Sequence, residues 1–268
     1  MLFIRHEATR EYNPALSVDS LQTNQSPILA FRNTLRNMTN YNISIVSDTV
    51  CPWCYVGKNR LQVAINNHKQ TYPNDTFTTT WFPFYLNPDA PKQSRDKQTI
   101  YIEKFGEQRV KMMQGRLSEI GRELGINFAY GGKTGNTRDS HRVVQLAKTK
   151  GEGTQTRVME KLFNAYFELN EDITDHAVLT KAAVGGGLEE KEVKEWLESD
   201  KGGPEVDREV AAAQRRFISG VPHFTIQNMY EVGGAEEPAT FLQIFNEVKK
   251  SEGANGSAAT QVSSGNTC

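Results

Sequence analysis

Two cysteines separated by two residues constrain the fold of this chain more than any other feature of its 268 residues. Cys51-Pro52-Trp53-Cys54 follows residues 42–47, which alternate in polarity and are rich in β-branched side chains, as strands are. Pro52 suits the first turn of a helix, and the apolar residues of 52–70 recur at helical spacing. The sequence therefore predicts that the cysteine pair lies where a strand passes into a helix.

That position has chemical consequences for the two thiols. Backbone N–H groups at a helix N-terminus are unpaired and the helix dipole is positive there, so a thiolate at Cys51 is expected to be stabilised. Two intervening residues on a helical turn bring the second sulfur within bonding reach of the first. We therefore expect Cys51 to attack a disulfide and Cys54, set deeper on the helix, to resolve the mixed disulfide that forms.

A zinc site is the main alternative for such a pair. Structural zinc usually takes four ligands in two paired clusters, whereas this chain holds three cysteines, Cys51, Cys54 and Cys268. No histidine lies within a few residues of the pair, so we expect no metal. The low cysteine count also indicates a reducing compartment, because secreted domains held together by disulfides carry more cysteines, in even number.

The rest of the chain predicts an α/β fold. Residues 77–86 alternate strongly and predict a second strand, parallel to the first and reached by a right-handed crossover. Strands are expected again at 223–226 and 229–232, followed by an amphipathic helix at 237–249. The long stretch between is almost wholly helical in pattern, with helices predicted at 98–105, 107–124, 139–150, 154–169, 176–184, 189–199 and 205–218. The simplest arrangement places all four strands in one mixed sheet and treats the helical block as an insertion.

The two ends of the chain have a different composition. Residues 1–40 show no sustained period and are expected to be a disordered leader, with Met38 as an alternative start. Residues 251–268 are rich in Gly, Ser, Ala, Asn and Thr and are expected to form a flexible tail. Cys268 could act there as a third redox partner, but a free terminal thiol without function is the favoured interpretation.

Bulk composition excludes several partners and addresses. A formal net charge of -1 gives no reason to expect nucleic acid, and no apolar run approaches the roughly 18 residues that span a bilayer. The first residues lack the long apolar core of a secretory signal. Glu7, Glu11 and Asp19 disfavour a mitochondrial presequence, because transit peptides avoid acidic residues. We therefore expect a cytoplasmic protein.

Several segments together resemble a known family. Residues 47–57, Ser-Asp-Thr-Val-Cys-Pro-Trp-Cys-Tyr-Val-Gly, resemble the active-site segment of the DsbA-like thioredoxin domain, and most closely its FrnE-type dithiol–disulfide isomerase branch. Asn136-Thr137 with His141-Arg142 resembles a segment of the family's helical insertion. Gly220-Val221-Pro222 resembles the cis-proline loop of thioredoxin-like folds, and residues 233–238 resemble the start of the last helix. The resemblance covers about residues 42–250.

The resemblance carries its own expectations about the fold and the site. It implies a thioredoxin-like domain over residues 41–250, with a mixed sheet of four to five strands and a helical insertion at about 98–204. It also implies that the Val221–Pro222 bond is cis and faces the cysteine pair, and that Trp53 is exposed at the rim. His223 either borders the substrate groove or simply begins a strand. The residues expected to bind substrate are Pro52, Trp53, Val221, Pro222 and His223.

The function implied is thiol–disulfide oxidation, reduction or isomerisation of protein or small-molecule disulfides. No cofactor is expected, although glutathione is a candidate redox partner. The alternative is a glutathione-dependent transferase or isomerase similar to the kappa-class glutathione transferases and 2-hydroxychromene-2-carboxylate isomerases, which use a hydroxyl-type residue instead of the cysteine pair. Retention of both Cys51 and Cys54 disfavours that class. A non-catalytic binding module is the third hypothesis, and the sequence does not reveal the oligomeric state.

Two further features of the sequence bear on function. Asp48, three residues before the pair, could steer protons toward Cys54 or cap the turn, and capping is favoured. Gly131-Gly132-Lys133-Thr134 resembles the end of a phosphate-binding loop, but Asn127 stands where that pattern needs its first glycine. We interpret this segment as a turn.

Overall fold

The computed structural model describes residues 38–151 and 153–261, and side chains up to residue 252. The predicted leader and Cys268 therefore lie outside the described residues, apart from residues 38–40 at the end of the leader. Within the described part the secondary structure begins at Asn40, in the first strand. The predicted start of the ordered domain at residue 41 is thus one residue away from the first strand residue.

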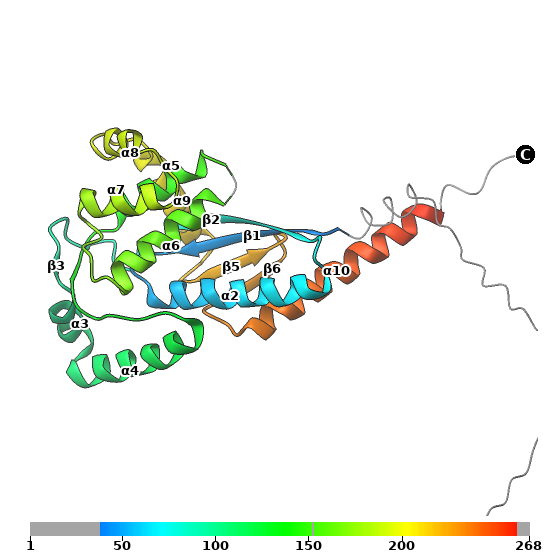
Figure 1. Ribbon diagram of the computed structural model, residues 1–268, viewed down its shortest axis with the longest axis horizontal. Helices are drawn as coiled ribbons and strands as arrows, with labels where there is room; N and C mark the ends of the chain where they lie inside the picture. Colours follow the sequence, from blue (N-terminus) through cyan, green and yellow to red (C-terminus); the bar gives the residue numbers. More distant parts are fainter. Residues whose placement is uncertain (1–37, 152, 262–268) are drawn as a thin grey trace, which may run out of the picture. The chain divides into compact units, whose positions relative to one another are not determined.

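A mixed four-stranded sheet forms the centre of the fold (Figure 1). Its strand order is β2-β1-β5-β6, with β1 at Asn40–Ser47, β2 at Thr76–Pro83, β5 at His223–Ile226 and β6 at Tyr230–Gly233. β1 pairs in parallel with β2 and antiparallel with β5, which pairs antiparallel with β6. The prediction of one mixed sheet from two distant strand pairs is confirmed.

The alternation of β1 places its side chains on two opposite faces of the sheet. Tyr41, Ile43 and Ile45 face the main hydrophobic core, which also contains Cys51 and Cys54. Val46 instead packs with Ala213 and Ile218 in a smaller cluster near α9. Because both faces are covered, the end of β1 is held rigidly just before the cysteine pair.

Helix α2 (Pro52–Thr71) follows β1 and carries the second cysteine. It packs against α10 (Pro238–Gln261), as Figure 1 shows. The sequence predicted a flexible tail from residue 251, whereas α10 continues to Gln261. A helix that has already formed extends at low cost, since nucleation is the unfavourable step.

The helical insertion between β2 and β5 also matches the predicted pattern. Its helices are α3 (Lys97–Phe105), α4 (Glu107–Leu124), α5 (Arg138–Lys148), α6 (Thr154–Phe167), α7 (His176–Gly185), α8 (Glu190–Leu197) and α9 (Gly203–Arg215). A short ladder between β3 (Arg95–Asp96) and β4 (Lys133–Thr134) was not predicted, because two-residue strands carry no readable period. β4 contains the end of the Gly-Gly-Lys-Thr segment, which is therefore not a phosphate-binding loop followed by a helix.

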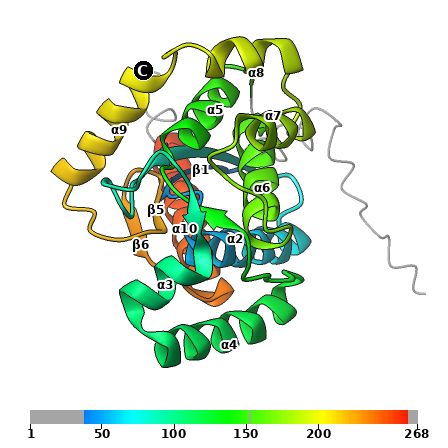
Figure 2. The ribbon, with the colours of Figure 1, turned by 90° about the vertical axis from the view of Figure 1, so that its left-hand side faces the viewer.

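The pair α3–α4 lies beside α2, below the rest of the insertion in Figure 2. Val56 of α2 forms a separate core cluster with Leu117 and Ile120 of α4 and with Ile126. This contact fixes α4 against α2, the helix that carries Cys54. The β3–β4 ladder ties the two segments that flank the α3–α4 pair to each other. The α3–α4 pair therefore forms a wall next to the start of α2.

Candidate active site

Cys51 is the N-cap residue of α2, and Pro52 occupies the first helical position. The backbone of Cys51 is extended, with φ -92° and ψ 112°, and no side chain caps the helix. The Cys51 carbonyl accepts the first helical bonds, from the backbone N–H groups of Cys54 and Tyr55. The thiol of Cys51 thus sits where unpaired N–H groups and the positive end of the helix dipole converge.

The second thiol lies deeper. Both cysteines are free thiols and buried, with exposed fractions of 3% for Cys51 and 1% for Cys54. Burial, a hydrogen bond that the Cys54 thiol donates to the Cys51 sulfur and the charge of Cys51 raise the pKa of the Cys54 thiol, and these outweigh the opposing hydrogen bonds from Ser47 and the Asp48 backbone. Cys54 is therefore held as the neutral thiol.

The loop before β5 faces the cysteine pair. The Val221–Pro222 peptide bond is cis, as the family resemblance implied. The Cys51 thiol donates a hydrogen bond to the Val221 carbonyl, with 3.5 Å between sulfur and oxygen. Gly57 allows the close approach of α2 to this loop, because a Cβ there would lie 3.0 Å from Pro222 Cγ and 3.1 Å from Phe224 Cζ.

Residues 48–51 form a turn, here called the active-site turn, in which the Cys51 N–H donates to the Asp48 carbonyl. The Asp48 side chain is buried. One carboxylate oxygen accepts the backbone N–H of Leu86 at 2.8 Å, and the other accepts that of Val50 at 3.4 Å. His141 Nε2 lies 3.1 Å from the Phe84 carbonyl and 3.4 Å from Asp48 Oδ1. Asp48 therefore caps the turn, as predicted, and also ties it to the loop after β2.

The start of α5 supports the same turn. Ser140 and Thr49 share a hydrogen bond of 2.7 Å between their hydroxyl oxygens, and both side chains are buried. His141 contacts the turn through Asp48 from the next position along α5. The segment that resembles the family's insertion thus packs directly against the residues before Cys51.

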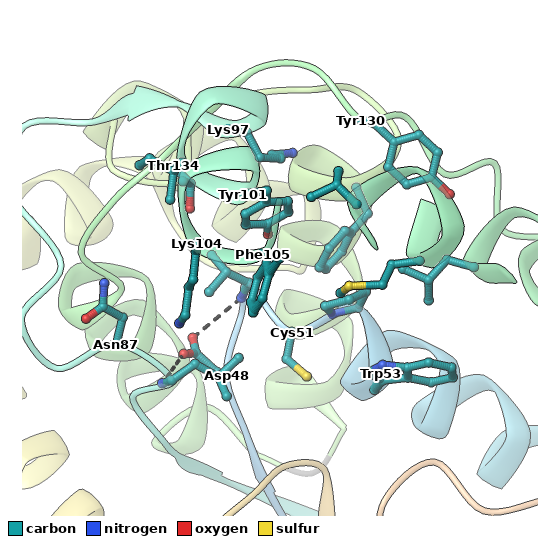
Figure 3. A pocket seen from close by; sticks show the side chains of 18 of the residues that line it. Asp48, Cys51, Trp53, Asn87, Lys97, Tyr101, Lys104, Phe105, Tyr130 and Thr134 are labelled. Atoms are coloured by element: carbon teal, nitrogen blue, oxygen red, sulfur yellow. Dashed lines mark hydrogen bonds between the residues drawn. The ribbon is translucent and has the colours of Figure 1, made fainter. Parts of the chain in front are cut away.

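A cavity of about 400 Å³ opens beside Cys51 (Figure 3). The active-site turn lines one side, and α3, α4 and the segment 128–137 line the other. Cys51 lies on its wall, while Cys54 does not line it. Most of the other lining side chains are apolar, including Val50, Leu86, Ile100, Phe105, Val110, Met113, Leu117, Phe128 and Phe167.

The predicted substrate-binding residues divide into two groups. Pro52, Trp53 and Val221 line the cavity, and Trp53 is 38% exposed, at the rim as expected. Pro222 and His223 do not line it. His223 begins β5, and its Nε2 has no hydrogen-bond partner among the described residues. The nearest carboxylate oxygen of Glu231 is 3.9 Å from this nitrogen. Burial, with a smaller contribution from Arg216, lowers the pKa of His223, although Glu231 opposes this shift.

Polar residues on the far side of the cavity were missed by sequence reasoning. Lys97, Tyr101 and Thr134 line it, and Tyr166 lies behind them. They come from α3, β4 and α6, so no local motif unites them. Lys97 alone gave a signal, because a lysine at the first position of a helix opposes the helix dipole.

The described residues contain no group of three or more His, Cys, Asp or Glu side chains placed to hold a metal ion. Within the same residues, no helix is both long enough and apolar enough to cross a membrane.

A mixed sheet, a cysteine pair at the start of the first helix of the domain and a facing cis-proline define a thioredoxin-like dithiol site. The sequence also matches the family to which this fold and site point. Residues 42–246 match the family model of the DSBA-like thioredoxin domain, so this chain belongs to that family of thiol–disulfide oxidoreductases.

Individual proteins are similar to this chain in sequence or in fold. The chain is 29% identical over 215 residues to the uncharacterized protein YwbO of Bacillus subtilis strain 168, covering 78% of this chain and 98% of that protein. The crystal structure of a probable DsbA oxidoreductase, SCO1869 of Streptomyces coelicolor, is similar with a TM-score of 0.68 and 26% identity over 78% of this chain and 89% of the other. The structure of a 2-hydroxychromene-2-carboxylate isomerase shares the fold, with a TM-score of 0.52 and 16% identity over 83% of this chain and 100% of the other.

Proposed function

We propose that this protein exchanges and isomerises disulfides through Cys51 and Cys54. The observation that carries the proposal is the placement of the two free thiols: Cys51 lines the cavity, and Cys54 lies one helical turn behind it. The Cys51 thiolate attacks a substrate sulfur, so a Cys51–substrate disulfide forms as the substrate S–S bond breaks and one thiol leaves. Cys54 then attacks Cys51, which releases the second thiol and oxidises the pair by two electrons.

The contrast between the two thiols supports this division of roles. Burial raises the pKa of Cys54, so it remains protonated until Cys51 has become part of a mixed disulfide. Attack by Cys54 then requires loss of its proton. If the substrate instead resolves the mixed disulfide with another of its own thiols, the same site acts as an isomerase without net oxidation.

The residues around Cys51 suit an extended substrate segment. Trp53 offers an aromatic surface at the rim, and Pro52 and Val221 border the cavity. The Val221 carbonyl accepts the thiol hydrogen of Cys51 in the reduced protein. In our proposal these residues, together with Pro222, position the substrate sulfur in line with Cys51. His223 serves the site by beginning β5 behind this loop.

The substrates that we propose are protein or small-molecule disulfides, with glutathione as a thiol partner and no further cofactor. The low cysteine count favours a cytoplasmic address, in which reduction or isomerisation would prevail over net oxidation. The mainly apolar cavity is the observation that favours the second candidate, a glutathione-dependent transferase or isomerase. That candidate does not need the Cys51 thiol for its chemistry.

A redox titration in glutathione buffers tests the proposal. Trp53 lies between the cysteines, so its fluorescence should report their redox state. The mass shift after thiol alkylation is measured in the same samples. We expect one transition, which is lost in Cys51→Ser. If Cys51 and Cys54 stay reduced across the whole range, the oxidoreductase proposal is wrong.

Trapping experiments assign the two roles. Cys54→Ser should accumulate mixed disulfides through Cys51, whereas Cys51→Ser should accumulate none. Equal trapping by the two variants would contradict the assignment. Full activity in Cys51→Ser would instead favour the glutathione-dependent alternative.

A further inference from the structure

Lys97 is a buried cation that pairs with no carboxylate in the part of the chain that the structure describes. Its side chain lines the cavity, the residue is 3% exposed, and it forms no salt bridge within residues 38–151 and 153–252. Its Nζ donates to the Tyr166 carbonyl at 2.9 Å and lies 3.7 Å from the centre of the Tyr166 ring. Other buried or half-buried lysines differ: Lys58 pairs with Glu160, and Lys249 pairs with Asp75.

A cation in this position is unfavourable for the fold alone. Burial of a charged group costs free energy unless a counter-charge or several hydrogen bonds replace its water. The Lys97 ammonium has three N–H donors but only one oxygen acceptor, the Tyr166 carbonyl. Lys97 is also the first residue of α3, where the helix dipole repels a cation. Burial lowers its pKa to about 8, so it still carries its charge at neutral pH in most molecules.

Hydroxyl groups extend from Lys97 toward the active-site turn. Tyr166 donates to Thr134 Oγ1 at 2.8 Å, which leaves the Thr134 hydroxyl hydrogen free to point elsewhere. The hydroxyl oxygens of Tyr166 and Tyr101 are 3.4 Å apart. Tyr101 and Cys51 line the same cavity. Burial raises the pKa of Tyr101, a hydrogen bond from Tyr166 opposes this shift, and the charges of Cys51 and Asp48 add to it. Figure 3 shows Lys97, Tyr101 and Cys51 around the same cavity.

The rest of the cavity determines the size and polarity of its ligand. A volume of about 400 Å³ suits a small molecule. The apolar side chains of α3, α4 and Phe128 offer few partners for a polar ligand. A ligand that satisfies the site therefore has an apolar body and one anionic group.

We propose that Lys97, with the hydroxyls of Tyr101 and Thr134, forms an anion-binding subsite for the carboxylate of a low-molecular-weight disulfide with an apolar body. The subsite holds the disulfide so that one of its sulfurs meets Cys51. This inference rests on the proposed disulfide exchange. Cys51 Sγ bonds to one substrate sulfur, the other sulfur leaves as a thiolate with the bonding electrons, and Cys54 completes the two-electron reduction of the substrate.

A single-turnover experiment with the reduced full-length protein tests the subsite. The probes are the aromatic disulfide dithiobis(nitrobenzoate), which carries a carboxylate on each ring, and its uncharged bis-amide. The ratio of the two rates is compared between variants, because intrinsic reactivity cancels in that comparison. We expect Lys97→Met to lower the carboxylate-to-amide ratio by about tenfold or more, as loss of a charge-assisted hydrogen bond does.

Lys111→Met is the matched control. Lys111 is an exposed lysine of the neighbouring helix α4 and does not line the cavity, so its removal should change the ratio by less than about twofold. An unchanged ratio in Lys97→Met, or an equal fall in Lys111→Met, would overturn the subsite. Lys97→Gln replaces Lys97→Met if circular dichroism shows that the latter does not fold.

A binding measurement separates the two proposals. Nitrobenzoate, which has no disulfide, is titrated calorimetrically into Cys51→Ser with and without Lys97→Met. Binding that depends on Lys97 supports the subsite even if neither disulfide reacts with the wild-type protein, an outcome that would refute only the exchange function. Absence of Lys97-dependent binding refutes the subsite, whatever the exchange rates.

Discussion

His141 Nε2 lies 3.4 Å from a carboxylate oxygen of Asp48, three residues before Cys51. The same nitrogen lies 3.1 Å from the Phe84 carbonyl. A carbonyl can only accept, so Nε2 carries a proton and is shared between the two oxygens. One side chain of the insertion thereby fixes both the turn before the cysteine pair and the loop after β2.

Replacement of His141 by phenylalanine keeps a ring of similar size but removes this donor. The Phe84 carbonyl and Asp48 Oδ1 would each lose a partner in a buried place, which should cost about 1–3 kcal/mol of unfolding free energy. Urea unfolding measures the change. His176→Phe is the control, because His176 is largely exposed and bonds Asp139, so that loss should stay below about 1 kcal/mol. Equal losses in the two variants would contradict the role of His141.

Gly57 is expected to resist substitution despite its helical position. Glycine to alanine inside a helix normally stabilises by about 0.5–1 kcal/mol. At residue 57 the new methyl would press on Pro222 and Phe224, so Gly57→Ala should instead destabilise by about 1 kcal/mol and slow exchange at Cys51. Gly115 lies in α4, and no atom lies within 4 Å of a Cβ added there, so Gly115→Ala should show the usual increase in the free energy of unfolding. A gain of similar size in both variants would show that the α2–loop contact is not tight.

The pH dependence of stability should report the burial of Lys97. Its pKa falls from the ordinary value of 10.5 to about 8 in the folded protein, so the unfolded chain binds the proton more tightly. The charge penalty is fully present below pH about 8 and is relieved as the pH rises toward 10.5. Between pH 8 and 10.5 the free energy of unfolding of the wild type should therefore rise by up to about 3 kcal/mol relative to that of Lys97→Met.

Unfolding curves at a series of pH values between neutral and alkaline measure this gain. Lys104→Met, at an exposed position, should differ from the wild type by a nearly constant amount. A constant difference for Lys97→Met as well would mean that the lysine is not desolvated in the native protein.

Asp75 should have the opposite pH behaviour at the far end of α2. Burial raises its pKa, but hydrogen bonds from Lys249, His68 and the Thr39 backbone outweigh this effect and leave the pKa below its ordinary value of 3.8. Its contribution is present above that value and is lost as the pH falls through the lower, folded-state pKa. Asp75→Asn should therefore be about 3 kcal/mol less stable than the wild type at neutral pH, with the difference narrowing in acid.

Asp89→Asn, an exposed position, controls for the loss of charge and should change stability by less than about 0.5 kcal/mol. Thermal or urea unfolding at neutral pH and in acid distinguishes the two variants. If the Asp75→Asn difference does not narrow in acid, Asp75 does not act through its ionised form.

The residues predicted from sequence share a local signature. The cysteine pair, the strand before it and the Gly-Val-Pro loop each depend on neighbours within a few positions, so pattern and resemblance could place them. The extension of α10 beyond residue 250 depends instead on continuation of an existing helix through a Gly-rich segment. Composition alone pointed to a flexible tail there.

The polar residues of the cavity could not be predicted from local sequence patterns. Lys97, Thr134 and Tyr166 are separated by more than thirty residues at each step and meet only after the insertion has packed. A tyrosine in an amphipathic helix is indistinguishable in sequence from a core aromatic. The position of Lys97 at the start of α3 was the one local anomaly, and it acquires meaning only once its burial is known.

The wall formed by α3 and α4 has an evolutionary consequence. Cys51, Cys54 and the cis-proline loop belong to the thioredoxin scaffold, whereas much of the opposite side of the cavity belongs to a separate stretch of chain, residues 97–134. Mutations in residues 97–134 can change which molecules reach Cys51 without altering the cysteine pair or the cis-proline loop. Related proteins can therefore differ in substrate specificity through substitutions in α3 and α4 while they keep the same cysteine pair.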